Sequence, residues 1–472
     1  MKKTFFAVLG FFAFTTSFSQ TGWTLQQCID QAIKNNLSIK QSEITSQMSE
    51  VNLRQSEAGI LPSLNAGATH TYNIGKNIDR YTNTFANSTV LSQNFYLSSQ
   101  VTLWSGMAQY NNVRQNDYSY RATKENLEQM KNDVSLNVAS SYLQVIYNGE
   151  LMKVAESQVK ISKEQLDRTE KMAEAGSVAK SSVYDIKAQL ANDEYTYIST
   201  QNSYNIALLN LKQLLYLDTV NNFSIARPDL EVLSGDLMSL KVSDVYQEAL
   251  KNQHSIKSAE YTMMSAEKGL AAARGKISPT LNFNASIGTG YSGLSKKVIS
   301  ASYNGTLEQT EYVTSGGQFV YTPGVDVITQ KTPFTEQFKN NVNKSVGFSL
   351  NVPLFNGLST YSTVKNAKLQ MLNSKYAYDL RRQQLFKTIA QAYADAQASL
   401  NKFVAAKAAY DAANTAFTFT EQKFNVGAIS AYDYSNAKNR LLKSQADVLN
   451  GKFDYIFKLK VLDFYQGKPL TF

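Results

Sequence analysis

Residue types that commonly carry out catalysis or bind metals are rare in this chain. Its 472 residues include only two histidines, His70 and His254, and one cysteine, Cys28. The sequence has no clustered set of metal ligands, no nucleophile elbow and no phosphate-binding lysine loop. A lone cysteine cannot form an intrachain disulfide, so Cys28 is predicted to be a small apolar residue on a helix face. We therefore expect no cofactor and no enzymatic activity.

One stretch does match a chemical motif. Residues 288–293, GTGYSG, fit the Gly-x-Gly-x-x-Gly pattern that approaches the phosphates of a dinucleotide. Such a site needs a helix directly after the glycines, inside a strand-helix-strand unit. The next residues, LSKKVISASYNG, do not have a helical pattern. We interpret the glycines as a flexible loop just past a membrane strand.

The clearest structural pattern is a strand that turns at a glycine into a long helix. Residues 345–354 alternate between polar and apolar, with the apolar side chains at Val346, Phe348, Leu350, Val352 and Leu354. A period of two indicates a strand, and ten residues are about enough to cross a bilayer as a tilted barrel strand. Asn356-Gly357 then ends the alternation, and residues 94–113 repeat the same order. Strands are predicted at about 63–73, 94–104, 280–290 and 345–355.

The helices are predicted from apolar spacings of three and four and from the absence of proline. A first helix covers 24–58 with Thr24 as its N-cap, and a helix of nearly 70 residues covers 107–175. A return helix follows at 178–217, which Ser181 and Ser182 can cap. The second half contains helices at 243–276, 358–425 and 429–465. Because two shorter helices together match each long one in length, we predict a coiled-coil column about 100 Å tall.

The chain is an internal duplication. Pro62 and Pro279 lie 217 residues apart, as do Ile39 and Ile256, whereas two glycine pairs lie 251 apart, namely Gly106 with Gly357 and Gly176 with Gly427. The difference of 34 predicts a longer loop in the second copy, at roughly 290–342. We divide the chain into a signal peptide at 1–20, a first repeat at 21–235 and a second repeat at 236–472.

The N-terminus indicates secretion, and the hydropathy of the chain limits how it could enter a membrane. Lys2 and Lys3 precede an apolar run and then small residues, which is typical of a secretory signal. After it no apolar run reaches 18 residues, so membrane insertion requires strands that close on themselves. Four strands are too few to enclose a lumen, whereas three chains supply twelve, so we expect a homotrimer. The net charge of +9 is scattered, and we expect no nucleic-acid partner.

The whole mature chain resembles the TolC-like outer-membrane efflux proteins. Two stretches carry the resemblance best, KFNVGAISAYDYSNAKNRLLKSQADV at 423–448 and KMAEAGSVAKSSVYDIKAQL at 171–190. The resemblance implies a trimeric channel-tunnel, with a twelve-stranded β-barrel in outer-membrane lipid and an α-helical coiled-coil barrel in the periplasm. It also implies docking onto a periplasmic adaptor and an inner-membrane transporter. The expected function is the exit duct of a tripartite efflux or type I secretion system.

The resemblance assigns roles to individual residues. It places a periplasmic aperture at Asp433 and Asn436, and strand-helix pivots at Pro62, Gly106, Pro279 and Gly357. The turns expected to dock the adaptor comprise Gly176, Ser177, Val178, Gly427, Ala428 and Ile429. This chain departs from the pattern at three positions. Ile429 stands where the best-known member has a gate arginine, Asn436 stands where the family can have a second acid, and Ser182 stands at the acidic position of the first turn.

Three questions stay open at the level of sequence. Asp433 is either one of a ring of three carboxylates that attracts cations or a carboxylate that stabilises a helix N-terminus. The segment 295–335 is either an extracellular element that restricts the outer mouth or meets phage and antibodies, or a passive insertion. The alternative to a duct is a trimeric surface adhesin with a membrane β-barrel anchor, although helices on both sides of each strand hairpin argue against it.

Overall fold

The structure of the chain, a computed structural model, describes residues 22–78, 82–83, 85–87, 89–217, 223–228 and 241–470. The signal peptide expected at 1–20 lies outside these residues. The chain divides into two compact units. We call them the helical unit, which takes the described residues up to Glu50 with Tyr118–Met263 and those from Asn373 onward, and the strand unit, which takes Val51–Asp117 and Met264–Leu372. Each unit therefore draws residues from both halves of the sequence.

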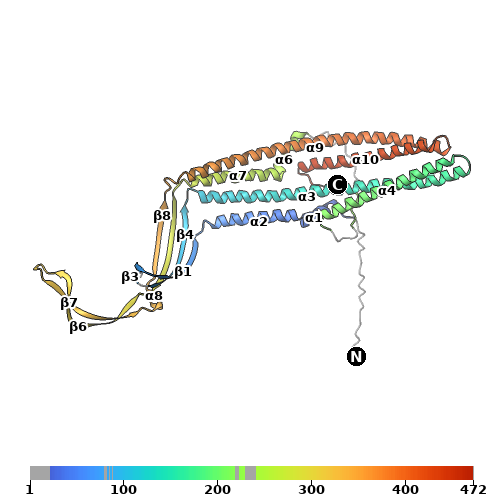
Figure 1. Cartoon of the computed structure of the whole chain (residues 1–472). Helices are drawn as coiled ribbons and strands as arrows, with labels where there is room; N and C mark the ends of the chain where they lie inside the picture. The colour runs from blue at the N-terminus through green and yellow to red at the C-terminus, as the bar shows by residue number, and fades with distance from the viewer. Residues whose placement is uncertain are drawn as a thin grey trace, which may run out of the picture. The chain divides into compact units, whose positions relative to one another are not determined.

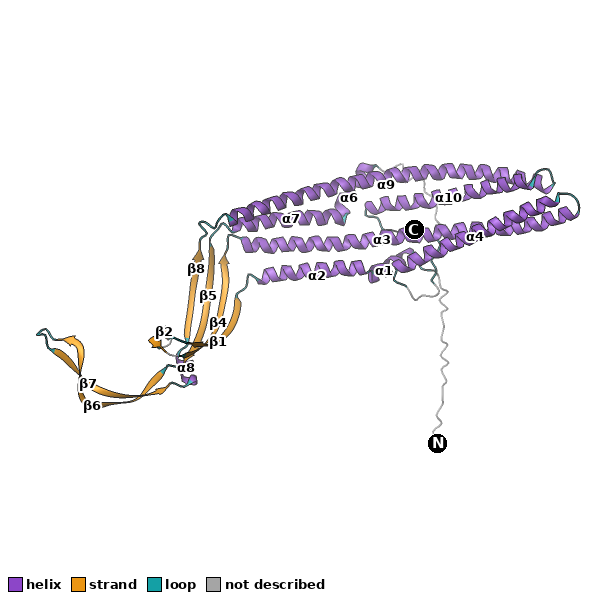
Figure 2. Cartoon of the chain, in the orientation of Figure 1, coloured by secondary structure: helices purple, strands orange, loops and turns teal. Residues whose placement is uncertain are grey.

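Two long helices, each followed by a shorter return helix, account for much of the chain (Figures 1 and 2). The long ones are α3 (Ala108–Glu174) and α9 (Ser359–Asn425), each of 67 residues. Their return helices are α4 (Lys180–Leu214) and α10 (Ala431–Tyr465). These positions agree with the predicted helices to within about two residues at most ends. None of the described helices has an apolar stretch long enough to cross a membrane.

The helix that precedes each strand hairpin is interrupted, which the sequence analysis missed. The predicted helix 24–58 is two helices, α1 (Leu25–Asn35) and α2 (Leu37–Ala58), separated by Asn36 in an extended conformation. The Asn36 side chain accepts hydrogen bonds from the backbone N–H groups of Ser38 and Ile39, so it caps α2. The predicted helix 243–276 likewise divides into α6 (Val242–Asn252) and α7 (His254–Gly275) at Gln253, 217 residues later. The break is thus part of the repeat.

The main hydrophobic core of the helical unit joins α1, α3, α4 and α10. Cys28, Val138, Val145 and Leu211 are fully buried within it. Cys28 therefore occupies the apolar helix position predicted for it. The Tyr142 hydroxyl is 2.6 Å from the Ala226 carbonyl oxygen and 3.1 Å from that of Trp23, so it ties two connecting segments to α3. As predicted, two shorter helices, α1 before the first strand hairpin and the return helix α4 after it, pack against the same long helix, α3.

The strand unit contains a four-stranded antiparallel sheet in the order β1-β4-β5-β8. Its members lie where strands were predicted: β1 (Ser63–Asn73), β4 (Val90–Trp104), β5 (Thr280–Ser292) and β8 (Asn343–Asn351). β4 and β5 pair across the two repeats, with Leu97 opposite Ile287. β8 ends at Asn351 instead of about 355, because Pro353 has no N–H to donate. The GTGYSG stretch is not a loop, since its first five residues belong to β5.

The long segment expected to be a loop is an ordered hairpin. β6 (Lys296–Val313) pairs with β7 (Phe319–Lys331), and the short helix α8 (Phe334–Asn340) follows (Figure 2). Three register shifts in this pairing interrupt the period of two, which is why the alternation was not recognised. A much smaller hairpin, β2 (Lys76–Ile78) with β3 (Phe85–Asn87), occupies the equivalent place in the first repeat.

Candidate functional site: hairpin turns and strand-helix junctions

The two helical hairpins end in turns of identical backbone design. Gly176 and Gly427 adopt left-handed conformations, with φ of +75° and +73°. In each turn the residue after the glycine donates its N–H to a carbonyl five residues earlier, Ser177 to Met172 and Ala428 to Lys423, both at 2.9 Å. This is the hydrogen-bonding pattern of a glycine-terminated helix, in which a side chain would strain the backbone. Both glycine turns were predicted from the sequence.

The two turns lie next to each other in the helical unit. A Cβ added to Gly427 would be 3.7 Å from the Ser177 carbonyl oxygen. Just before the turns, an Arg168 guanidinium nitrogen donates to the Asn425 side-chain oxygen at 2.8 Å. The structure thus brings the first and second sets of predicted tip residues together. Gly176, Ser177, Gly427 and Ala428 are exposed, whereas the equivalent residues Val178 and Ile429 are half-buried.

Ile429 joins an apolar cluster beneath the turns. The cluster contains the buried side chains of Ile186, Phe424, Ala431 and Tyr434, with Ile429 packed against them. Phe424 and Tyr434 stack with ring centroids 4.8 Å apart, and burial raises the pKa of Tyr434. An apolar Ile429 makes no salt link, so the turn is stabilised here by packing. This agrees with the departure at Ile429 noted in the sequence.

Asp433 takes part in the cap of α10. Ser430 is the N-cap, and its Oγ accepts the Asp433 N–H at 3.2 Å while donating to the Asp433 carboxylate at 2.7 Å. Asp433 is exposed, and Asn436, one turn further along the helix, is half-buried. The capping interpretation of Asp433 therefore has direct support within one chain. The N-cap of the equivalent helix α4 is Ala179, which offers no side-chain cap, so the predicted role of Ser181 and Ser182 was wrong.

A buried ion pair near the turns was not predicted. The Lys438 ammonium of α10 is 2.8 Å from the Asp193 carboxylate of α4, and their side chains are only 1% and 5% exposed. Ser162 of α3 hydrogen-bonds to both groups, and Gln189 donates to the other Asp193 oxygen at 2.9 Å. The sequence did contain a signal, because Lys438 lies four residues after Tyr434, on the helix face that packs inward.

Each strand-to-helix junction uses two successive left-handed residues. Gly106 and Met107 have φ of +60° and +63°, and Gly357 and Leu358 have +62° and +65°. Pro62 and Pro279, both exposed, lie directly before β1 and β5 and four residues after the preceding helix. The four predicted pivot residues therefore occupy equivalent positions in the two repeats.

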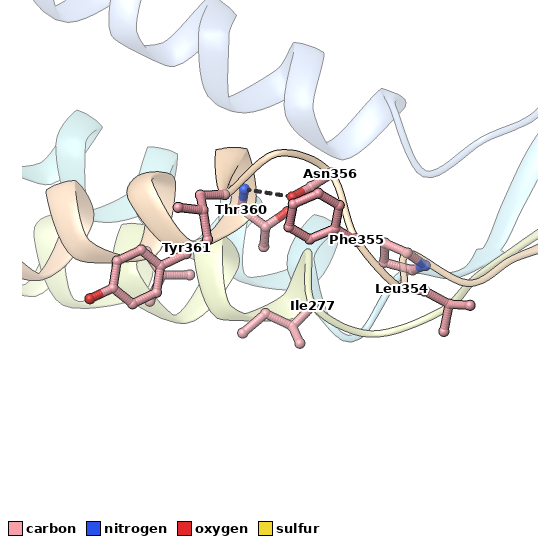
Figure 3. Close-up of a pocket in the computed structure, with 9 residues that line it drawn as sticks. Ile277, Leu354, Phe355, Asn356, Thr360 and Tyr361 are labelled. Carbon is pink, nitrogen blue, oxygen red and sulfur yellow. Dashed lines mark hydrogen bonds between the residues drawn. The ribbon is translucent and has the colours of Figure 1, made fainter.

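The two junctions differ in what covers them. A Cβ on Gly106 would lie 2.4 Å from the Gly275 carbonyl oxygen and 2.4 Å from Ser278 Cβ. At Gly357 nothing in the described chain lies within 4 Å of that position. Beside Gly357 is an open apolar groove of about 290 Å³, in which the Asn356 side chain accepts the Thr360 N–H (Figure 3). Its most exposed members are Leu354 and Phe355, at 91% and 82%.

Comparison with known proteins decides the family. The profile of a family described as "Outer membrane efflux protein" matches residues 28–215 and 245–463. The chain belongs to the outer membrane efflux protein family. The two matched segments correspond to the two strand-helix repeats, and the gap between them, residues 216–244, contains the predicted boundary between the repeats at 235 and 236.

Known members of the efflux family resemble most of the chain. The outer membrane protein TolC of Escherichia coli K12 is 21% identical over 443 residues, which is 92% of this chain and 80% of TolC. The crystal structure of CusC superposes with a TM-score of 0.75 at 16% identity, covering 94% of this chain and 92% of that one. VceC of Vibrio cholerae gives 0.73 at 15% identity, covering 94% and 96%.

Family membership confirms the expected fold class, function and location. This efflux-family chain is an outer-membrane exit duct whose helices extend into the periplasm. The adhesin alternative has no support from these comparisons.

The two histidines take part in local contacts, His254 Nδ1 with Glu125 at 2.6 Å and His70 Nδ1 with Gln93 at 2.7 Å.

Proposed function

We propose that three copies of this chain form the exit duct, each contributing four strands to a twelve-stranded barrel embedded in outer-membrane lipid. The observation that carries this proposal is the exposed junction at Gly357. Its counterpart, Gly106, packs against Gly275 and Ser278 of the other repeat. Residues 217 positions before these two are Ala58 and Leu61, which lie beside β1, at the opposite edge of the sheet.

A neighbouring copy would complete the exposed junction. If its β1 edge pairs with the β8 edge of this chain, its Ala58 and Leu61 would meet Gly357 as Gly275 and Ser278 meet Gly106. The apolar groove at Leu354 and Phe355 would then be covered. Because β1 and β8 have no strand partner on their outer sides within the described chain, the same pairing satisfies both edges. The domains 21–235 and 236–472 act in this proposal as equivalent repeats.

The paired hairpin turns are proposed as the docking surface for a periplasmic adaptor, which would connect the duct to an inner-membrane transporter. Two large apolar side chains beside the second turn, Val426 and Tyr432, are 79% and 71% exposed. Exposed apolar side chains that flank a rigid turn suit docking of a helical protein tip. The transporter supplies the energy and selects the cargo, so the chain itself needs no catalytic site.

Asp433 and Asn436 are proposed to line the periplasmic aperture. Threefold symmetry would turn each exposed Asp433 into a ring of three carboxylates, which raises the local concentration of cations. The cap formed with Ser430 is compatible with this role, because the carboxylate that accepts one hydrogen bond keeps other lone pairs toward water.

Planar-bilayer recording tests the proposed duct. Purified protein from detergent should insert and give discrete, long-lived conductance steps of one size. Folded protein that inserts into the bilayer but never gives conductance steps would contradict the proposal. Protein heated until its helical circular dichroism is lost is the matched control, and it should give none.

A further inference from the structure

The β6–β7 hairpin, which we call the ribbon, has one largely apolar face, whose only charged pair is Lys296 with Lys331 at the base of the hairpin. Cross-strand partners in an antiparallel pair lie on the same face of the sheet. Beyond that base pair, the paired residues on this face are Val298 with Thr329, Ala301 with Val327, Tyr303 with Val325, Leu307 with Pro323, Gln309 with Tyr321 and Val313 with Phe319. The large side chains there are about half exposed or more, such as Leu307 at 66% and Tyr303 at 61%. We call this the apolar face.

The opposite face of the ribbon is polar. Its pairs include Lys297 with Gln330, Ser302 with Asp326 and Glu308 with Thr322, alongside the exception Ser300 with Ile328. A two-stranded ribbon with one apolar face is only marginally stable in water unless that face is covered. The segregation of side chains therefore indicates a surface that packs against something.

The edges of the ribbon are unsuited to strand pairing. Register shifts between Val298 and Ser300, Tyr303 and Leu307, and Gln309 and Val313 bulge β6. Pro323 removes one N–H from β7. Bulges and edge prolines are the usual features that prevent a strand edge from pairing with another chain. The apolar face, rather than the edges, is thus the part of the ribbon that is free to bind.

The base of the ribbon is held firmly on the sheet. Gln337 of α8 is 2% exposed and donates to the carbonyl oxygens of Ser292 and Thr332 while accepting the Ser292 N–H. Lys297 pairs with Glu336 at 2.6 Å. The aromatic rings of Phe334 and Phe338 also pack against Phe95, with centroids 6.1 and 5.5 Å away. A fixed base argues that the ribbon is positioned, not a passive insertion.

The size of the apolar face discriminates between possible partners. β7 has 13 residues, which at about 3.4 Å per residue, with two strands about 4.8 Å apart, give a face of roughly 400 Å². A stable complex between free proteins buries about 800 Å² on each partner. The face is therefore too small to capture a free partner, but it suffices for copies already tethered together, whose effective concentration is high.

We propose that the apolar faces of three ribbons pack against one another on the threefold axis, with their polar faces toward water. The proposal rests on the trimer of the proposed function. β5 leads from the strand-helix junction to the ribbon, so the ribbons leave the sheet at the end remote from the helices and meet over the outer mouth of the duct. The partner of the ribbon is thus a second copy of this chain.

Disulfide trapping tests the proposal. Val325→Cys places a thiol on the apolar face, and Thr322→Cys, three residues away on the same strand, is the matched control on the polar face. Native Cys28 is fully buried and does not interfere. The mass of each purified variant in mild detergent is measured first, to establish its oligomeric state. The sample is then diluted, oxidised and run on a denaturing gel without reductant. We expect covalent dimers from Val325→Cys in at least tenfold excess over Thr322→Cys, and the same excess from Val327→Cys.

The outcomes separate this inference from the proposed function. Trimers whose Val325→Cys and Val327→Cys chains stay uncrosslinked would overturn the ribbon inference alone. Equal crosslinking from the control would also overturn it, since it would indicate mobile ribbons in random collision. Monomers before oxidation would overturn the trimer and the ribbon inference together.

Discussion

The Lys438 ammonium lies 2.8 Å from the Asp193 carboxylate, and both side chains are buried. The pair joins α10 of the second repeat to α4 of the first, and Ser162 adds α3. Removing one member of a buried pair leaves an uncompensated charge, which costs about 3–5 kcal/mol. Replacing both with apolar residues removes that charge. The pair therefore fixes how the two helical hairpins pack close to their turns.

This relationship predicts the behaviour of paired substitutions. Lys438→Met should lower the thermal unfolding midpoint strongly, and Lys438→Met with Asp193→Leu should recover most of the loss. Lys443→Met, on the same helix but outside the pair, is the control. The midpoint of helical circular dichroism measures the effect. A double variant as unstable as the sum of the single ones would show that the two charges act independently.

The N-cap of α10 should be measurable by hydrogen exchange. Ser430→Ala removes the side chain that accepts the Asp433 N–H, at a typical cost of about 1 kcal/mol. Exchange of the first-turn amides of α10 should therefore become roughly fivefold faster. Ala179→Ser is the matched reverse change, since Ala179 is the N-cap of α4 and provides no side-chain cap, and it should slow exchange in α4. Unchanged rates in both turns would contradict the capping account.

The variant Asp433→Asn distinguishes the proposed aperture role of Asp433 from its capping role. The aperture role predicts weaker cation preference and less block by multivalent cations in bilayer recordings, because a ring of three charges is removed. The capping role alone predicts unchanged selectivity with slightly lower stability. Asp185→Asn, in the first turns of the other return helix, is the control. Unaltered ion preference in inserted, folded protein would remove Asp433 from the aperture.

Cys28 should be inert until the helical core opens. Burial raises the pKa of its thiol from 9.0 to about 12, so the reactive thiolate is scarce in the folded protein near neutral pH. A group whose folded pKa is raised contributes stability that is complete below pH 9 and is lost as pH rises from 9 to 12. Cys28→Ala should therefore lose less thermal stability than the native chain between pH 8 and 11. Rapid maleimide labelling of native protein at pH 7.5 would contradict this burial.

Local chemistry explains what could be predicted from the sequence. Gly176 and Gly427 allow the left-handed backbone of the turns, and Pro62 and Pro279 mark the start of strands. Single residue types were therefore enough to predict these features. The duplicated spacing then placed the strands and long helices. These signals depend on neighbours in sequence and not on the folded structure.

Features that depend on tertiary contacts or on irregular backbone could not be predicted from the sequence pattern. The break at Asn36 follows from a side-chain cap, and at Gln253 the side chain instead donates to the Phe464 carbonyl oxygen, so both breaks depend on the surrounding structure. The ribbon was missed because its bulges disturb the alternation. The Lys438–Asp193 pair joins residues 245 apart, and only the fold shows that both charges point into one core.

The trimer is tested most directly by one engineered crosslink. A Cβ on Gly275 would lie 2.9 Å from Ala108 Cβ within the chain, and the equivalent positions between copies are Ala58 and Ser359. The account predicts that Ala58→Cys with Ser359→Cys, oxidised in membranes, runs as a covalent trimer on a denaturing gel, while each single variant runs as a monomer. A double variant that is folded in the outer membrane but stays monomeric on that gel would contradict it.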